Sequence, residues 1–434
     1  MTVDDDATEV NTVVIGAGQA GLATGYHLAK RNEDFVVLDA APAVGGSWRD
    51  RWDSLRLFTP AGFTHLPGLP FPAGRNEHPG KDAVADYLAG YAEQIELPVQ
   101  LGVRVQAVRR DGPHLLVVAG ARRWRARNVV LATGAHHLPV VPPFAGQLDP
   151  SITQLHARDY RRPAQLPGGP VLVVGAGNSG AEIALELATD PGSERKVHLA
   201  GRDVGHVPNL GPWTYPLLQW LGRPGAVLSQ RGLRGGGDPL GRVRPGQLEA
   251  AGVHRLPRVV DARDGVPVLA DGRALPATAV VWCTGLAPDY HWLHLDALDP
   301  TGQLRHHEGI LDSEPGLYAV GLPYQRSITS HLLGGVGADA EHVVDHLTAR
   351  TRPTRHVPLG DRRILAVSAT AVVRSLRSAC GTPSLLRGRS LSSAATQSRS
   401  AALCIARSLP LGRYCRNRPL VFSFVAPRRC CPPW

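Results

Sequence analysis

Short runs of apolar and β-branched residues alternate along the chain with glycine turns and stretches of helical spacing. Residues 10–15 form one such run, a glycine-rich turn follows at residues 16–21, a helical stretch continues to Lys30, and a second apolar run precedes Asp39. Continuous apolar runs of this length are typical of strands that a parallel sheet buries on both faces. The pattern predicts a strand, a turn, a helix and a second strand over residues 10–40.

The same order returns in the middle of the chain. An apolar run at residues 171–174 leads into a glycine-rich turn at 175–180, a helical stretch to about Ala188 and another run at 196–199. The Pro- and Gly-rich residues 161–170 are the expected linker. Two further runs, at 129–131 and 280–282, each end in a turn of small residues. This alternation predicts an α/β protein with parallel sheets, whereas residues 205–250 show too little periodicity for any prediction.

The first glycine turn has the context of a dinucleotide-binding site. Gly16 suits a tight turn after the strand, Gly18 lets the backbone approach a pyrophosphate, and Gly21 permits close packing of helix on strand. The helix N-terminus stabilises phosphate charge. Asp39, 18 residues after Gly21, is placed to accept hydrogen bonds from ribose hydroxyls. A tight turn without a ligand is the alternative, which the full strand–turn–helix context disfavours.

The second glycine turn has a different charged partner. The positions that correspond to the first turn are Gly175, Gly177, Asn178, Ser179 and Gly180. Arg202 lies 22 residues after Gly180, where a guanidinium suits the 2′-phosphate of NADPH and an acid would repel it. A solvated surface arginine is the alternative. Two dinucleotide sites in one chain indicate a flavin beside a nicotinamide, so we expect FAD and NADPH as cofactors.

Seven further blocks carry a more specific signal. They are residues 45–48 (GGSW), 54–60 (SLRLFTP), 66–72 (LPGLPFP), 132–134 (ATG), 283–285 (CTG), 316–321 (GLYAVG) and 334–340 (GGVGADA). In order and spacing, the chain over about residues 9–349 resembles the two-dinucleotide flavoproteins related to flavin-containing monooxygenases, including their bacterial branch. The resemblance implies further cofactor contacts from Gly46, Trp48, Thr133, Gly134, Thr284, Gly285, Gly321 and Asp339.

The resemblance also implies a domain order, in which an FAD-binding Rossmann-type domain contains an inserted NADPH-binding Rossmann-type domain. We expect the first part of the FAD-binding domain in residues 1–165, the NADPH-binding domain in residues 166–285, and the C-terminal part of the FAD-binding domain in residues 286–349.

The function implied by the resemblance is an NADPH-dependent FAD oxidoreductase that oxygenates a small organic substrate. NADPH would transfer a hydride to the flavin, O2 would add to the reduced ring as a C4a-hydroperoxide, and the activated oxygen would pass to an amine, a sulfide or a ketone. Because the flavin does this chemistry, we expect no metal site. His136–His137 and His306–His307 lack the carboxylate or cysteine spacing of a metal centre.

Two departures from the family concern the reacting groups. Of the fingerprint between the domains, the chain keeps His156 and Tyr160 but not the preceding Phe and Gly. These two residues either contact the cofactor linker or fix a loop. In the flavin-side loop, Phe58 stands where animal members carry an asparagine. An apolar ring cannot donate a hydrogen bond, so the candidates for a catalytic role are Phe58 by position and its polar neighbours Arg56 and His65.

The charge is unevenly distributed. The 434 residues carry a formal net charge of +10, but residues 350–434 contain 16 Arg, no Lys and one acidic residue, which leaves −5 for residues 1–349. For this Arg/Ser-rich tail we favour the product of a reading-frame error in an Arg-rich gene. A disordered basic tail that contacts nucleic acid or membrane, and a folded extra domain, are the alternatives.

Composition excludes several classes of function. Residues 1–349 contain a single cysteine, Cys283, so a thioredoxin-reductase-type enzyme with a redox-active Cys pair is excluded. The acidic balance of residues 1–349 predicts no nucleic-acid partner. The acidic start and the absence of long apolar runs predict a cytoplasmic protein without a membrane span, acting on a small molecule and O2. A flavin reductase or oxidase without oxygenation and a non-catalytic flavin-binding protein remain as alternatives.

Overall fold

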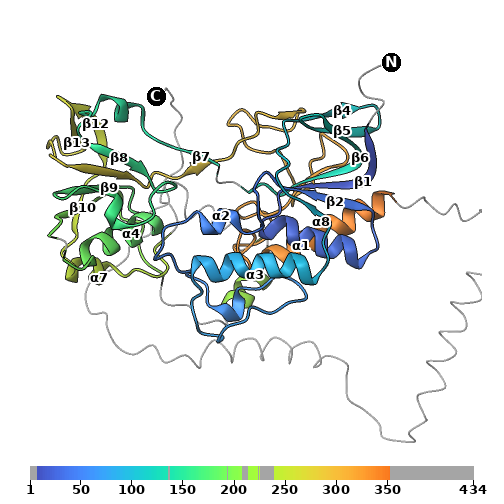
Figure 1. Cartoon of the computed structure of the whole chain (residues 1–434), viewed down its shortest axis with the longest axis horizontal. Helices are drawn as coiled ribbons and strands as arrows, with labels where there is room; N and C mark the ends of the chain where they lie inside the picture. The colour runs from blue at the N-terminus through green and yellow to red at the C-terminus, as the bar shows by residue number, and fades with distance from the viewer. Residues whose placement is uncertain are drawn as a thin grey trace, which may run out of the picture. The chain divides into compact units, whose positions relative to one another are not determined.

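The computed structural model describes residues 7–134, 137–192, 194–207, 214–222, 224 and 239–351. The predicted tail from residue 352 onward, His136 and parts of residues 205–250 lie outside these ranges. Within them, two separate sheets with helices packed on them confirm the predicted α/β fold (Figure 1).

The first sheet has eight strands in the order β16–β4–β5–β6–β1–β2–β3, with β17 also paired to β6. The strands are β1 (Thr8–Ile15), β2 (Phe35–Leu38), β3 (Val99–Gln100), β4 (Ala107–Asp111), β5 (His114–Ala119), β6 (Arg122–Leu131), β16 (Leu293–His294) and β17 (Leu317–Ala319). The first half of β6 pairs antiparallel with β5, and its last three residues pair parallel with β17. The second half therefore completes a parallel sheet in which β1 and its glycine turn lie centrally.

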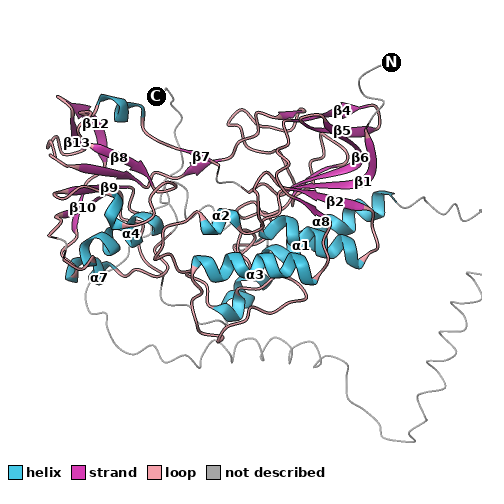
Figure 2. Ribbon diagram, in the orientation of Figure 1, coloured by secondary structure: helices cyan, strands magenta, loops and turns pink. Residues whose placement is uncertain are grey.

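Three helices cover one face of this sheet: α1 (Gln19–Lys30), α3 (Lys81–Gln94) and α8 (Val336–Thr351), as Figure 2 shows. Their apolar side chains form one core with Val14, Val37 and Val130 of the strands. The neighbouring strand positions Val13 and Val36 point the other way, into a core shared with β4 and β5. Both faces of the central strands are buried, as their continuous apolar runs require.

The second sheet is parallel throughout, in the order β11–β10–β9–β14–β8. Its strands are β8 (Thr153–His156), β9 (Val171–Val174), β10 (Val197–Ala200), β11 (His254–Leu256) and β14 (Ala279–Trp282). Helices α4 (Asn178–Thr189) and α7 (Pro245–Ala250) pack on one face, and the hairpin β12 (Val259–Arg263) and β13 (Val266–Leu269) on the other. The described part also contains α2 (Gly46–Arg49), α5 (Thr214–Trp220) and 3₁₀ helices at Ala61–Phe63, Pro143–Gln147 and Pro163–Gln165.

The chain passes from the first sheet to the second and back through two adjacent segments. After β6 it forms β7 (Leu138–Pro139), and after β14 it forms β15 (Leu286–Ala287), and these two short strands pair antiparallel. The strand β8 precedes residue 165 yet belongs to the second sheet, so the predicted division at that residue stays a prediction. No helix in the described part has both the length and the apolar character needed to span a membrane.

Candidate functional site

The first glycine turn has a geometry that only glycine permits at two positions. Gly16 has φ +107°, and a Cβ there would lie 2.5 Å from the carbonyl oxygen of Ala132. A Cβ on Gly21 would lie 1.7 Å from the carbonyl oxygen of Gly16. Around Gly18, by contrast, a Cβ would meet nothing within 4 Å. The first and third glycines are therefore required by packing, and the second borders open space at the N-terminus of α1, where a phosphate can approach the backbone.

Asp39 ties the end of β2 to this turn. One carboxylate oxygen accepts a hydrogen bond from the backbone N–H of Ala17 at 2.5 Å, and the other accepts one from Ala41 at 2.7 Å. An ionised carboxylate can accept about four hydrogen bonds. The side chain is thus fixed by two backbone groups and keeps acceptor sites for the hydroxyls of a ribose.

The second glycine turn repeats this geometry. Gly175 has φ +104°, and a Cβ on Gly180 would lie 1.8 Å from its carbonyl oxygen. Gly177, the residue before α4, has φ −76° and ψ −169°, against −77° and −173° at Gly18. A Cβ on Gly177 would also meet nothing within 4 Å. The two turns are therefore the same local structure built twice, each at the centre of its own sheet.

The two turns of small residues lie beside the glycine turns. Thr133 and Gly134 follow β6, and Thr284 and Gly285 follow β14. Both glycines have positive φ, at +79° and +94°. The carbonyl of Ala132 faces the first glycine turn, and that of Cys283 faces the second. The Thr284 hydroxyl donates a hydrogen bond to the Val140 carbonyl, which adds to the pairing of β7 with β15.

Arg202 lies at the end of β10, close to the second glycine turn. The preceding Gly201 packs so tightly that a Cβ would lie 2.8 Å from the backbone nitrogen of Ala176. The Arg202 side chain is exposed, and in the part of the chain that the structure describes its guanidinium has no hydrogen bond or ion pair. It is thus available for an anionic group bound at this edge of the sheet.

Asn178 has a role that the sequence did not indicate. Its side-chain oxygen accepts a hydrogen bond from the backbone N–H of Gly241 at 2.9 Å, and its side-chain nitrogen donates to the Pro239 carbonyl at 3.3 Å. Asn178 therefore holds residues 239–241 against the start of α4. Its direct contact with a cofactor stays a prediction, as does that of the half-buried Ser179.

The short helix α2 presents Gly46 and Trp48 near the first sheet. The preceding Gly45 has φ +82°, and a Cβ there would lie 2.6 Å from the Ala85 carbonyl oxygen, so α2 contacts α3 directly. Gly46 begins α2, and the half-buried Trp48 packs against the helix-side core.

Gly321 and Asp339 each lie at the start of a helix, Gly321 against the first turn of α1 and Asp339 within the first turn of α8. A Cβ on Gly321 would lie 2.8 Å from the Cβ of Ala20, so the chain after β17 packs directly on the first turn of α1. Asp339 lies in the first turn of α8, and only 1% of its surface is exposed. Among the described residues, its Oδ2 has no hydrogen-bond partner.

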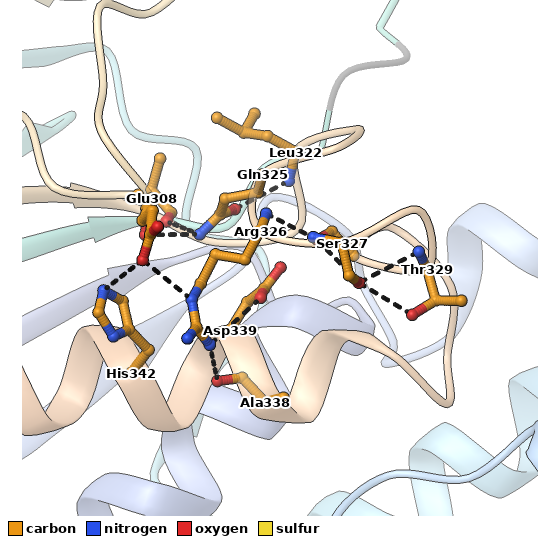
Figure 3. Close-up of polar contacts among 12 residues, drawn as sticks. Glu308, Leu322, Gln325, Arg326, Ser327, Thr329, Ala338, Asp339 and His342 are labelled. Atoms are coloured by element: carbon orange, nitrogen blue, oxygen red, sulfur yellow. Dashed lines mark hydrogen bonds and ion pairs between the residues drawn. The ribbon is translucent and has the colours of Figure 1, made fainter. Parts of the chain in front are cut away.

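Asp339 is surrounded by a polar cluster, shown in Figure 3. The Arg326 guanidinium lies 3.8 Å from Asp339 Oδ1 and donates a hydrogen bond to the Ala338 carbonyl at 3.2 Å. Glu308 contacts Arg326 at 3.3 Å and His342 at 3.6 Å. Burial raises the pKa of Asp339 to about 6, although the Ser330 side chain and, to a smaller extent, Arg326 act to lower it. A buried acid with one unpartnered oxygen is suited to accept a hydrogen bond from a ligand hydroxyl.

His156 and Tyr160 form hydrogen bonds with other residues of the chain. His156 Nε2 donates to the Gly285 carbonyl at 3.0 Å, and Nδ1 accepts from the Arg158 N–H at 3.0 Å. Burial lowers the pKa of His156, in keeping with this neutral tautomer. The Tyr160 hydroxyl is buried and donates to Glu186 at 2.8 Å. In this structure both side chains fix the segment between the sheets, one of the two roles the sequence left open.

The three candidates for a catalytic role do not converge on one cavity. Arg56 donates a hydrogen bond to the His78 carbonyl at 3.2 Å and lines a cavity of about 620 Å³ beside α3. Phe58 is 40% exposed and lines a second, smaller cavity. His65 is exposed and lines neither. Their catalytic roles stay predictions.

Cys283 is unsuited to thiol chemistry. Burial raises the pKa of its thiol to about 12, and no second cysteine occurs in residues 1–349. Among the described residues, no three histidine, cysteine or acidic side chains gather in a metal-binding arrangement.

The sequence analysis also did not predict an ion pair that lies beside the second glycine turn. Glu182 on α4 lies 3.5 Å from the guanidinium of Arg242, and its side chain is 9% exposed. Burial raises the pKa of Glu182 to about 7. Glu182 lies one helical turn after Asn178, so the sequence could have placed both residues on the same face of α4. It could not have indicated the partner Arg242, which lies in the segment without periodicity.

Known proteins share this arrangement. The family model described as pyridine nucleotide-disulphide oxidoreductase matches residues 13–219. An uncharacterized CzcO-like oxidoreductase of Geobacillus kaustophilus is 37% identical over 78% of this chain and 98% of its own length. YUCCA7 of Arabidopsis thaliana, a probable indole-3-pyruvate monooxygenase, is 30% identical over 76% of this chain and 86% of its own length.

A solved structure gives the same result. The flavin-containing monooxygenase of Stenotrophomonas maltophilia is 32% identical, covers 80% of this chain and 100% of its own, and has a TM-score of 0.67. These relatives confirm the family predicted from the sequence and agree with the expected cofactors, FAD and NADPH. The chain therefore belongs to the flavin monooxygenase-like family of FAD-dependent oxidoreductases.

Proposed function

We propose that this protein uses NADPH to reduce a bound FAD and transfers one oxygen atom from O2 to a small organic substrate. The observation that carries the proposal is the pair of glycine turns, which have the same geometry but lie beside side chains of opposite charge. Asp39 stands beside the first turn as an acid held by backbone N–H groups, and Arg202 stands beside the second as an exposed guanidinium. An acid suits the ribose hydroxyls of FAD, and an arginine suits the 2′-phosphate of NADPH.

The residues of the first sheet fit FAD. The open space around Gly18 and the free N–H groups at the start of α1 would bind the pyrophosphate, and Asp39 would accept ribose hydroxyls. The unpartnered oxygen of Asp339 would accept a further hydroxyl of the cofactor. When bound, the flavin supplies the redox chemistry: it takes a hydride from NADPH and activates O2.

The residues of the second sheet fit NADPH. The space around Gly177 would receive the pyrophosphate at the N-terminus of α4, and Arg202 would bind the 2′-phosphate. The pairing of β7 with β15, strengthened by Thr284 and His156, joins the two connections between the sheets. This pairing would hold the two cofactor sites in register. The predicted cytoplasmic location stays a prediction.

A reductase or oxidase without oxygenation is the second candidate function. It is favoured by Phe58, whose apolar ring cannot donate a hydrogen bond beside the flavin. Without such support, reduced flavin would return its electrons to O2 as hydrogen peroxide, and no product would be oxygenated.

One experiment separates the two functions. FAD-loaded full-length protein is mixed with NADPH under argon, O2 is admitted, and methyl p-tolyl sulfide, phenylacetone or phenylpyruvate is supplied as substrate. We expect NADPH to bleach the flavin and the oxygenated product to account for most of the NADPH consumed. Peroxide in place of product would select the reductase or oxidase. If neither NADPH nor NADH bleaches the flavin, the proposed function is wrong.

A further inference from the structure

A small basic cavity lies beside Phe58 and close to the start of α4, and no residue of either glycine turn lines it. It has a volume of about 50 Å³ and is lined by Phe58, His78, His206, Gly241, Arg242 and Arg244. About 10–15 Å³ of such space holds one water molecule, so the cavity has room for a small polar group such as a carboxylate.

Hydrogen bonds fix the wall of this cavity that comes from the first domain. The Leu57 N–H donates to the Pro79 carbonyl at 2.9 Å, and His78 Nδ1 lies 2.9 Å from the Leu57 carbonyl. Because a carbonyl only accepts, Nδ1 carries the proton and Nε2 remains for another partner. The Phe58 carbonyl accepts a hydrogen bond from the Tyr215 hydroxyl at 3.4 Å.

The opposite wall comes from residues 239–244 and is held as firmly. Asn178 bonds the backbone at Gly241 and Pro239, and Leu240 exchanges backbone hydrogen bonds of 3.0 Å with residues 205 and 207. A Cβ on Gly241 would lie 3.2 Å from the Cβ of Phe58, so the two walls meet there. The cavity is therefore built before any ligand arrives.

Its lining is positively charged. Arg242 and Arg244 both line the cavity, on either side of the buried Val243, which packs in the core of the second sheet. Arg242 is paired with Glu182, whose pKa of about 7 leaves that acid partly neutral at neutral pH. Within the described residues, Arg244 has no ion pair. The cavity therefore retains positive charge that a bound anion would neutralise.

We propose that this cavity binds the carboxylate of the substrate, so that the protein acts on an organic acid. The proposal rests on the function proposed above, because it assumes that a substrate is bound beside Phe58. A carboxylate matches the planar guanidinium fork of arginine. The phosphates of NADPH have separate expected partners, the second glycine turn and Arg202, whereas this cavity includes Phe58 from the flavin-side loop of the other domain.

The test measures binding without turnover. FAD-loaded full-length protein is titrated calorimetrically, in the absence of NADPH, with two matched pairs of ligands: pyruvate against 2,3-butanedione, and phenylpyruvate against phenylacetone. We expect the acid of at least one pair to bind at least about tenfold more tightly than its neutral partner. Arg244→Gln removes this preference, and Arg244→Lys, which keeps the charge, restores part of it.

Controls distinguish a substrate carboxylate from a cofactor phosphate and from a general effect of surface charge. Arg263→Gln removes the same charge from the exposed β12 of the same domain and should leave the preference intact. Equal binding of acid and neutral ligand in both pairs overturns the proposal. It is also overturned if Arg244→Gln weakens NADP+ binding about tenfold but not acid binding, since the anion is then a cofactor phosphate. Because these titrations involve no turnover, a failure of oxygenation chemistry would leave their outcome unchanged.

Discussion

Asp339 is a carboxylate that the fold buries while leaving one oxygen without a partner among the described residues. Its pKa in the folded protein is raised to about 6 from an ordinary 3.8, so the folded state holds a proton that the unfolded chain releases between these values. The contribution of this proton to the free energy of unfolding is fully present below pH 3.8 and is lost as pH rises through 6. We expect Asp339→Asn to raise the free energy of unfolding of the flavin-free protein by about 1–3 kcal/mol above pH 7. Urea unfolding at several pH values measures this, and the gain should shrink on acidification.

FAD binding should show the opposite dependence on this group. The ionised carboxylate is the better acceptor for a cofactor hydroxyl, so bound FAD lowers the pKa of Asp339 and binding releases a proton. We expect FAD affinity to fall as pH decreases through about 6, and Asp339→Asn to weaken affinity at pH 8 and to flatten this dependence. Flavin fluorescence titrations measure it. The exposed Glu341→Gln on the same helix serves as control, and equal pH profiles in wild type and Asp339→Asn would contradict the assignment.

Arg202 allows a test of nucleotide choice at a single side chain. Replacing its exposed guanidinium by Gln removes the partner expected for the 2′-phosphate. A charge-assisted hydrogen bond contributes about 1.5–3 kcal/mol, so KM for NADPH should rise about tenfold to hundredfold while KM for NADH changes little. Rates of flavin reduction under argon with each nucleotide provide the measurement. A parallel loss with both nucleotides would place Arg202 in folding and not in phosphate recognition.

At the scale of the element, the strand–turn–helix unit occurs twice and can be broken one copy at a time. Gly21→Ala and Gly180→Ala each force a Cβ into a carbonyl oxygen, at 1.7 Å and 1.8 Å. Overpacking of this kind costs about 1–3 kcal/mol or more and displaces the helix start. We expect Gly21→Ala to abolish FAD binding, and Gly180→Ala to keep FAD but lose its reduction by NADPH. Absorbance of the purified proteins shows both. Gly146→Ala, where a Cβ meets nothing within 4 Å, is the matched control.

These units could be predicted from the sequence because their signal is local. Strand, glycines and helix follow one another within about 30 residues, and the first and third glycines of each turn are required by backbone atoms of the same turn or of the turn that follows the adjacent strand. The pairing of β6 with β17, the pairing of β7 with β15 and the hydrogen bond between Asn178 and Gly241 join residues 60 or more positions apart. No period in the sequence reports such contacts. The small basic cavity was missed for the same reason, since its arginines lie in a segment without helical or strand spacing.

At the scale of the whole molecule, the proposed FAD site combines residues from both ends of residues 8–351. Helix α8 packs on α1, and Arg350 near its end donates hydrogen bonds to the Arg127 carbonyl at 2.9 Å and to Asn128 at 3.0 Å. Asp339 lies in the first turn of the same helix. The Geobacillus relative is covered over 98% of its length by 78% of this chain, so about a fifth of this chain has no counterpart in that relative.

Two truncated chains test this division. A chain ending at Arg352 keeps α8 and the Arg350 contacts, and it should bind FAD as tightly as the full chain and give an equal or higher yield of flavin-bound protein. A chain ending at Gly335 lacks α8 and Asp339, uncovers the α1 side of the core, and should bind no flavin. Flavin content per chain after gel filtration distinguishes these outcomes. Loss of flavin from the chain ending at Arg352 would show that residues 353–434 are part of the fold. Retention in the shorter chain would show that α8 does not complete the FAD site, and the role proposed for Asp339 would then be wrong.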